Sequence, residues 1–168
     1  MFFACTNNSK EVKDFFAEQN LPIGYSKNVN HIYKDSGRIT SKMYTPLLLD
    51  FSNRKLNPYS EFPEGIEIIS FKNNGKDSLK ITGDYAINYS KTYLSQIVGN
   101  VVITNFADGS VLETEELYWD DKSNYFFTDK DFKMTQGENI MFGSGFESKQ
   151  DLSNRVIRKM YGRGPVKE

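Results

Sequence analysis

The sequence predicts an all-β domain built from antiparallel hairpins that stack into two facing sheets around an apolar interior. Aromatic side chains supply 14% of the 168 residues, and they favour strands over helices. Turn-forming pairs such as Asn74-Gly75 and Asp108-Gly109 separate short segments rich in β-branched and aromatic residues, which is typical of hairpins. A short motif also recurs between Asp84 and Asp131, at intervals of 16, 16 and 15 residues. This period fits two short strands with their turns.

Composition narrows the classes of function. The chain has 21 basic and 22 acidic residues, so it lacks the strongly basic surface that nucleic-acid binding requires. It has one Cys and one His, which leaves almost nothing from which to build a disulfide framework, a zinc site or a catalytic Cys-His pair. No segment reaches the roughly 18 apolar residues that span a bilayer. We expect no cofactor and no metal.

Residues 1–24 are expected to be a signal-peptide remnant followed by a polar tether. Ala4 precedes the only cysteine, Cys5, as at the end of a bacterial lipoprotein signal peptide, which makes Cys5 a candidate lipid anchor. The match is incomplete, because a signal peptide also needs a basic region and about 7 to 15 apolar residues. The alternative is a free thiol in a frayed terminus. Farther along, Val12 and Phe15 have helical spacing, which predicts one or two marginal turns of helix.

Residues 25–152 form the predicted β domain, in which residues two apart share one face of a strand. Each repeat carries two bulky apolar residues at that spacing, and the return strands carry similar pairs. The alternation slips between Thr114 and Leu117, and a β-bulge at Glu115 or Glu116 would restore it. The candidate inner-face residues are Ile66, Ile68, Phe71, Ile81, Tyr85, Ile87, Val101, Ile103, Leu112, Leu117, Trp119, Phe126, Phe132, Met134, Ile140 and Phe142.

Several segments of this domain resemble the LptC family of periplasmic lipopolysaccharide-export proteins. The run from Asp108 to Asp120, followed by Thr128-Asp129 and then by Gly143–Ser148 with Asp151-Leu152, is similar to the repeat shared by LptC-like and LptA/OstA-like domains. Upstream, Tyr33–Arg38 and Phe62–Ile66 are similar to the opening strands of the family. The motifs are fairly specific when taken together and weak when taken singly.

The resemblance implies a twisted, open antiparallel β-jellyroll that catalyses no reaction. Such a subunit serves outer-membrane biogenesis: it accepts lipopolysaccharide from the inner-membrane Lpt ABC transporter and passes it to an LptA-like bridge protein by edge-strand pairing. It lies in the periplasm and is anchored to a membrane, with the inner membrane favoured. LptC proteins usually begin with a transmembrane helix, whereas this sequence offers an acyl anchor through Cys5, so the choice of membrane stays open.

If the resemblance holds, the inner-face residues line a lipid groove in which acyl chains complete the packing. The alternative is that the same side chains form an ordinary sandwich core, and the residues alone leave both open. A relay of jellyrolls also needs uncovered strand edges. The candidate edges are the first strands, around His31 to Met43, and the last, around Ile140 to Ser148. The alternative for each is a terminal strand covered by loops.

Other candidate sites carry less weight. His31 has no accompanying nucleophile motif, so a catalytic role is disfavoured. The carboxylates between Asp108 and Asp121 fit a solvated face better than a calcium site or a glycosidase pair, because no calcium-loop motif accompanies them. Residues 153–168 are predicted to be a basic, disordered tail. Two alternative functions stay open: a structural or carbohydrate-binding cell-surface β-sandwich lipoprotein, and a hydrolase acting through the acidic cluster.

Overall fold

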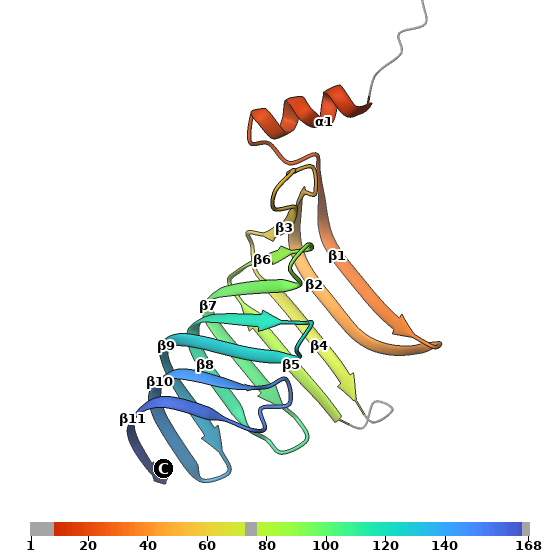
Figure 1. Ribbon diagram of the computed structural model, residues 1–168. Coiled ribbons are helices and arrows are strands. Elements are labelled where there is room, and N and C mark those ends of the chain that lie inside the picture. Colours follow the sequence, from red (N-terminus) through yellow and green to blue (C-terminus); the bar gives the residue numbers. More distant parts are fainter. Residues whose placement is uncertain (1–8, 73–76, 166–168) are drawn as a thin grey trace, which may run out of the picture.

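The chain folds into one antiparallel β-sheet that bends over on itself, with a short helix beyond its N-terminal end (Figure 1). The structure is a computed structural model and describes residues 9–72 and 77–165. The elements are helix α1 (Ser9–Glu18) and strands β1 (Gly24–Asp35), β2 (Arg38–Phe51), β3 (Tyr59–Phe62), β4 (Ile66–Lys72), β5 (Asp77–Gly83), β6 (Tyr85–Tyr89), β7 (Leu94–Asn105), β8 (Val111–Asp120), β9 (Tyr125–Gln136), β10 (Asn139–Lys149) and β11 (Val156–Pro165). The predicted all-β class and the twisted, open antiparallel arrangement are confirmed.

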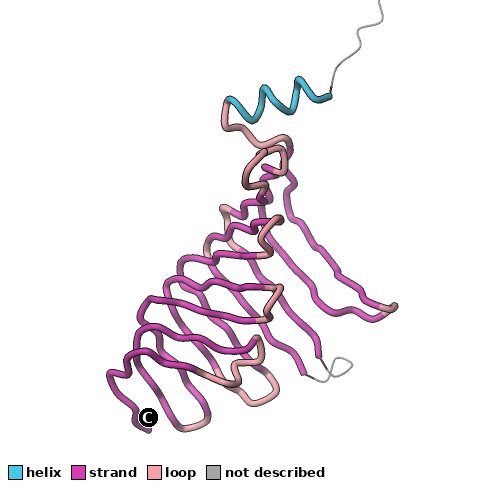
Figure 2. The backbone as a smooth tube through the Cα atoms, viewed as in Figure 1, coloured by secondary structure: helices cyan, strands magenta, loops and turns pink. Residues whose placement is uncertain are grey.

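The strands stack one beside another along a single axis, and their turns gather at the sides of the stack (Figure 2). The order in the sheet is β11-β10-β9-β8-β7-β5-β4-β2-β3-β6, with β1 beside β2 and a further pairing of β6 with β7. The Asn74-Gly75 turn expected between β4 and β5 lies outside the described residues. Within the described part of the chain, β1 and β11 each have one neighbouring strand, so they form the two edges of the sheet.

The C-terminal edge differs from the prediction in two ways. Residues 156–165 form β11 instead of a disordered tail, and β10 is therefore an inner strand with β11 paired along it. The pairing satisfies backbone groups that β10 would otherwise leave open. Ile157 of β11 also packs against the core, which adds a hydrophobic contact to the ladder of hydrogen bonds.

Strands β7 to β10 each turn a corner partway along their length. The pairing register shifts between Val98 and Val101 in β7, between Thr114 and Tyr118 in β8, and between Ser144 and Phe146 in β10. An irregularity therefore lies near Glu115, where the sequence analysis expected one, but the extra residue is not in β8. From Thr114 to Tyr118, β8 takes four steps while β9 takes five, and β7 takes three steps from Val98 to Val101 against two in β8. At the β7 corner Gly99 and Asn100 both have positive φ, as a sharp change of direction requires.

The corners divide the sheet into two facing layers. Layer A contains β3, β6 and residues 94–98, 116–120, 125–128 and 146–149 of the long strands. Layer B contains β4, β5 and residues 101–105, 111–114, 132–136 and 139–143. β2 also joins the two layers, because one part of it pairs with β4 and the other with β3. The polar residues that open the sequence repeat lie at or beside these corners, which explains its period.

Alternate side chains of the two layers meet in the interior. The side chains that are fully buried there include Ile81, Ile97, Ile103, Leu112, Leu117, Phe126, Met134 and Phe146. They form one contiguous cluster that draws on both layers. At the corners the two layers are joined covalently, because the strands pass from one layer to the other. Away from the corners they are held together by hydrophobic contacts.

Helix α1 sits beyond the β1–β3 end of the sheet and runs for ten residues, longer than the one or two turns expected. A helix of this length is marginal alone, and the loop after β2 supports it. Asn53 Nδ2 donates to the Lys13 carbonyl (2.9 Å), and Arg54 donates to Asn20 Oδ1 (3.0 Å) and to the Leu21 carbonyl (3.2 Å). Among the described residues, no helix is long and apolar enough to cross a membrane.

Candidate functional site

A hollow of about 560 Å³ opens between the two layers near the N-terminal end of the sheet. Its floor is apolar and consists mainly of Met43, Leu48, Phe62, Ile66, Ile68 and Ile97. Hydrogen-bonding side chains also line it, among them Ser41, Ser60, Asn88, Ser90, Ser95 and Asp121. His31 and Tyr33 of β1 approach from the other side, with their ring centroids 5.1 Å apart. A ligand that fits this hollow has a hydrocarbon part and a polar part.

The hollow exists because small side chains occupy inward positions of layer A. Ala86 is 2% exposed and faces the interior of β6, where the sequence analysis placed Tyr85 and Ile87. Ser60 and Ser95 take corresponding inward positions on β3 and β7. Bulky residues there would fill the space with side chains, as they do farther along the sheet. Ile66 and Ile68 of layer B and Phe62 and Ile97 of layer A remain large, so the hollow keeps a hydrophobic floor.

Trp119 lies at the boundary between the hollow and the filled interior. Its side chain lines the hollow and packs against the core, with an edge-to-face contact to Phe126 at 5.8 Å between ring centroids. The indole Nε1 is buried and has no hydrogen-bond partner among the described residues. A buried N–H without an acceptor is costly, and a ligand oxygen in the hollow would be a suitable acceptor.

The structure divides the predicted inner-face residues into three groups. Ile66, Ile68 and Trp119 line the hollow, and Ile87 borders it as well, although its register partners Glu61 and Gln96 place its side chain on the outer face of β6. The side chains of Ile81, Val101, Ile103, Leu112, Leu117, Phe126, Phe132 and Met134 lie in the core cluster, where side chains pack against one another. Phe71, Tyr85, Ile140 and Phe142 do neither.

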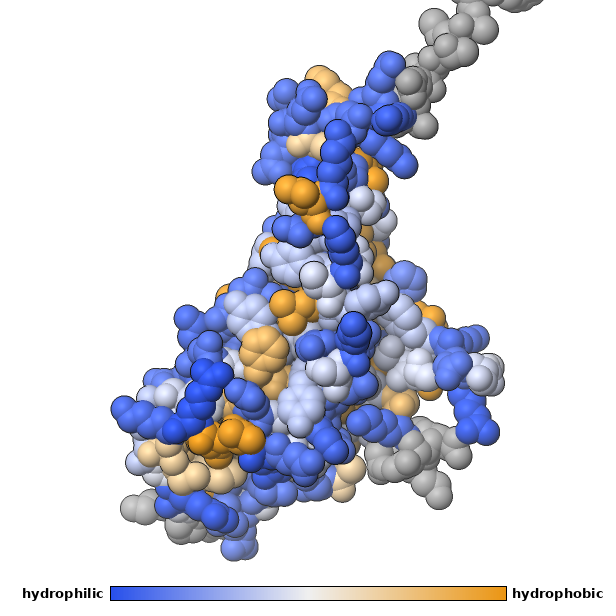
Figure 3. Space-filling view, viewed as in Figure 1, coloured by the Kyte–Doolittle hydropathy of each residue, from blue (hydrophilic) through white to orange (hydrophobic). Residues whose placement is uncertain are grey.

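The third group reflects a wrong choice of face in three strands. In β10 the inward residue is Met141, at 8% exposure, whereas Phe142 is 45% exposed. In β4 Phe71 lies on the outer face, where Lys42 Nζ stands 5.8 Å from its ring centroid. Hydrophobic side chains are also visible on the outer surface (Figure 3), which explains why alternation did not identify the inner face.

Tyr85 contributes to a polar outer face of layer A. Its hydroxyl donates to Glu61 Oε1 at 2.8 Å. Burial raises the pKa of the Tyr85 phenol well above its usual value, and the Glu61 carboxylate raises it further because it accepts a hydrogen bond from the protonated phenol and carries a negative charge. Nearby, Gln96 Nε2 donates to Glu116 Oε1 at 2.6 Å. These residues therefore stabilise the wall of the hollow from outside.

The side of the sheet opposite the corners is closed near the C-terminal end by the connection between β10 and β11. Backbone N–H of Gln150 donates to the Asn124 carbonyl of layer A at 2.9 Å, and the next residue, Asp151, accepts from Asn105 Nδ2 of layer B at 3.1 Å. Leu152 then enters the core cluster and is fully buried. Residues 150–155, termed the closing loop, therefore join the two layers across the interior.

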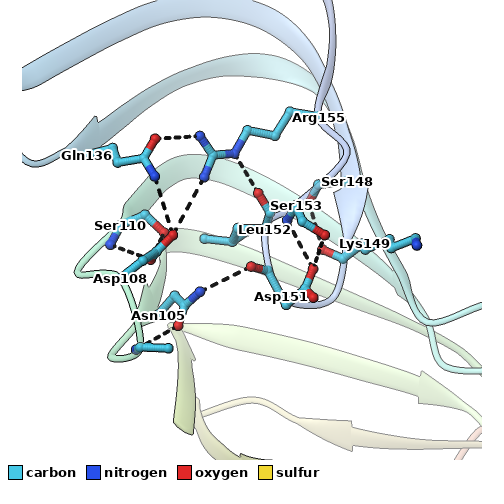
Figure 4. Close-up of polar contacts among 11 residues, drawn as sticks. Asn105, Asp108, Ser110, Gln136, Ser148, Lys149, Asp151, Leu152, Ser153 and Arg155 are labelled. Carbon is cyan, nitrogen blue, oxygen red and sulfur yellow. Dashed lines mark hydrogen bonds and ion pairs between the residues drawn. The ribbon is translucent and has the colours of Figure 1, made fainter. Parts of the chain in front are cut away.

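Arg155 fastens the closing loop to layer B (Figure 4). Its guanidinium donates to Gln136 Oε1 at 2.8 Å and stands 4.0 Å from Asp108 Oδ2, while its Nε donates to the Leu152 carbonyl. Burial raises the pKa of Asp108, but hydrogen bonds from Ser110 and the charge of Arg155 outweigh it, so the pKa lies below its ordinary value. The sequence analysis cited Asp151-Leu152 for the family resemblance but gave this loop no structural role, since only Leu152 interrupts a polar segment.

The dense carboxylates of β8 serve structural contacts. Glu113 pairs with Lys133 at 2.7 Å across β8 and β9, and Asp120 Oδ1 accepts from the backbone of Lys122 and Ser123 in the following turn. In residues 9–72 and 77–165, no group of three or more His, Cys, Asp or Glu side chains could hold a metal ion. Cys5, the candidate lipid anchor, lies outside the described residues.

Comparison with known proteins gives one finding. The sequence profile of the family described as "Lipopolysaccharide-assembly, LptC-related" matches residues 18–157, a range that extends from the end of α1 into β11. A search of curated proteins gave no match.

Proposed function

Because the chain belongs to the LptC-related family of lipopolysaccharide-assembly proteins, we propose that it holds lipopolysaccharide acyl chains in the hollow between its two layers during export. Family membership carries a role in lipopolysaccharide assembly in the cell envelope, and proteins of this family act in transport and not as catalysts. The observation that supports the finer proposal is the hollow itself, with an apolar floor and hydrogen-bonding groups beside it.

The chemistry of the hollow suits the part of the lipid where acyl chains join a polar headgroup. Each methylene buried against the floor contributes about 0.8 kcal/mol. The serine and asparagine side chains, together with Trp119 Nε1, supply donors for ester or amide carbonyl groups. Lipid therefore binds with its chains toward Ile66 and Ile68 and its headgroup outside the layers.

The two sheet edges are proposed as the contacts with the rest of the export machinery. β1 and β11 each present an edge with one neighbour in the described chain, and a partner strand can extend the sheet at such an edge. We assign the β1 side to the inner-membrane Lpt ABC transporter and the β11 side to an LptA-like bridge protein. This assignment makes lipid enter near the hollow and leave toward the C-terminal edge.

The proposed location is the periplasm, at the face of the inner membrane. Acylation of Cys5 would hold the sheet at the membrane, since each buried methylene of an acyl anchor adds about 0.8 kcal/mol of binding free energy. The test is mass spectrometry of the N-terminal peptide from membrane-extracted protein. An unmodified Cys5 thiol would remove this anchor from the proposal without affecting the lipid site.

Photo-crosslinking in cells tests the lipid site with neighbouring residues as matched pairs. p-Benzoylphenylalanine in place of Trp119 faces the hollow, and in place of Tyr118 it faces the outer surface of the same strand. A second pair uses Ile68, which lines the hollow, and Ile69, its outward neighbour on β4. We expect lipopolysaccharide adducts at Trp119 and Ile68 only. Adducts of equal yield at Tyr118 and Ile69, or none at any position, would overturn the proposal.

A further inference from the structure

We propose that the closing loop is a removable stopper and that Leu152 occupies an acyl-chain subsite beyond the hollow. Lipid that moves toward β11 displaces Leu152 and takes its place between the layers. This inference rests on the proposed function, because it concerns the same acyl-chain ligand. It assigns a second binding position, at the C-terminal end of the interior, which the hollow does not reach in the present structure.

The path from the hollow to the closing loop is short. Trp119 pairs with Phe126 in the register of β8 and β9, and Phe126 pairs with Ser148 in the register of β9 and β10. Ser148 is followed by Lys149, the last residue of β10, and then by the closing loop. An acyl chain that passes Trp119 therefore meets the interior that Leu152 closes.

Leu152 is the apolar anchor of an otherwise polar loop. Its side chain is fully buried, whereas Asp151, Ser153 and Asn154 are exposed. The isobutyl group of leucine consists of the same saturated carbon as an acyl chain. A lipid can therefore replace its contacts with the core without leaving a polar group unsatisfied.

The backbone of the loop is strained, which favours release. Leu152 has φ 58° and Asn154 has φ 51°. The left-handed region is unfavourable for a residue with a Cβ, and especially so for leucine, which lacks the local hydrogen bonding that makes Asn tolerable there. The strain persists only while burial of the Leu152 side chain compensates for it, and it is relieved when the loop leaves.

The attachments of the loop can break without disturbing the sheet. Side-chain groups make three of them: Asn105 to the Asp151 carbonyl, and Arg155 to Gln136 and Asp108. The ladder between β10 and β11 begins beyond the loop, at Glu147 and Val156. The layers are joined covalently at the corners, so release of the loop lets them separate at the opposite side.

The experiment uses the full chain and purified lipopolysaccharide in detergent micelles, with hydrogen–deuterium exchange as the readout. Lipid should raise exchange in peptides covering residues 149–155 and should leave exchange in peptides from the core of β7 and β8 unchanged.

A binding measurement compares two arginine variants. Arg155→Gln weakens the attachment of the closing loop. Arg158→Gln is the control because, among the described residues, Arg158 pairs only with Asp129 and Glu147 on the outer surface. Arg155→Gln should increase lipopolysaccharide affinity about fivefold, the effect of losing one hydrogen bond of the closed state. Arg158→Gln should leave it unchanged.

The outcomes distinguish this inference from the proposed function. Lipid adducts at Trp119 combined with unchanged or reduced exchange in residues 149–155 overturn the stopper while the lipid site survives. Absence of adducts at both Trp119 and Ile68 overturns the proposed function itself. Leu152→Ala provides a second variant: it should bind lipid more tightly than the parent protein if it folds, and Arg155→Gln decides the question if it does not. Equal affinities for Arg155→Gln and Arg158→Gln contradict the inference.

Discussion

Replacing Thr45 by Val should destabilise the protein far more than its conservative character suggests. Thr45 lies in β2 where this strand passes from layer B to layer A, and it is fully buried. Its Oγ1 lies 2.9 Å from the Leu47 carbonyl and 2.8 Å from the Gly65 carbonyl, so one hydroxyl ties the bend of β2 to the turn between β3 and β4. Valine has nearly the same shape but no donor, so the single hydroxyl proton that serves these partly buried carbonyls is lost. The expected loss is about 1–3 kcal/mol of unfolding free energy.

Urea unfolding followed by far-ultraviolet circular dichroism measures this loss. The midpoint should fall while the slope stays constant, which identifies a change in stability and not in the surface exposed on unfolding. The matched control is Thr40→Val, because Thr40 is exposed and its Oγ1 lies 3.4 Å from the Tyr33 carbonyl. That control should change stability by less than about 0.5 kcal/mol. If the two variants differ by less than this amount, the Thr45 hydroxyl does not hold the bend.

Three further predictions follow from packing and charge. Gly143→Ala places a Cβ against a β11 carbonyl and the ring of a layer B phenylalanine, and should cost about 1–3 kcal/mol in thermal unfolding, whereas Gly162→Ala meets no atom and should be near neutral. Met141→Ala should lower the free energy of unfolding by about 2–5 kcal/mol, and Phe142→Ala should lower it less, because Met141 is the inward residue. Urea unfolding of both variants measures the difference. The reverse order would mean that Phe142 faces the interior, as the sequence analysis expected. Because burial, and then a neighbouring carboxylate, raise the pKa of Tyr85, the unfolded chain loses this proton first. Stability should therefore decline as pH rises above 10, and Tyr85→Phe should make that decline shallower in unfolding curves measured against pH.

The sequence predicted the fold well because the strands carry strong local signals. In β7, β8 and β9, β-branched and aromatic residues alternate with polar ones, and Ile103, Leu112 and Met134 accordingly face the interior. The slip in the alternation of β8 located the corner of this strand before any pairing was known. The period of the sequence repeat equals the number of residues between successive corners of the sheet. Each corner is marked in the sequence by one polar residue.

Alternation failed where both faces of a strand are apolar. In β10 the residues Ile140, Met141 and Phe142 are all hydrophobic, so their sequence does not show that Met141 is the inner one. In β6 the small Ala86 is the inward residue, between two bulky neighbours. Pattern rules weigh large apolar residues and therefore choose the wrong face in such strands.

The hollow and the edge strand β11 were beyond the reach of the sequence for related reasons. A hollow is defined by side-chain volume that is missing at Ala86 and Ser95 from two different strands, and this coincidence requires the pairing of β6 with β7. β11 has few apolar residues, and Ile157 alone joins its packing against the core. Its order derives from hydrogen bonding to β10, which composition does not reveal.

The only tryptophan of the sequence is an intrinsic fluorescence probe of the hollow. Trp119 stands where the hollow ends and the filled interior begins. The wavelength and intensity of its emission depend on whether water, protein or hydrocarbon surrounds the indole. Under the proposed function, a lipid that reaches the boundary changes this emission, and the change can be recorded in an unlabelled molecule without a background from other indoles.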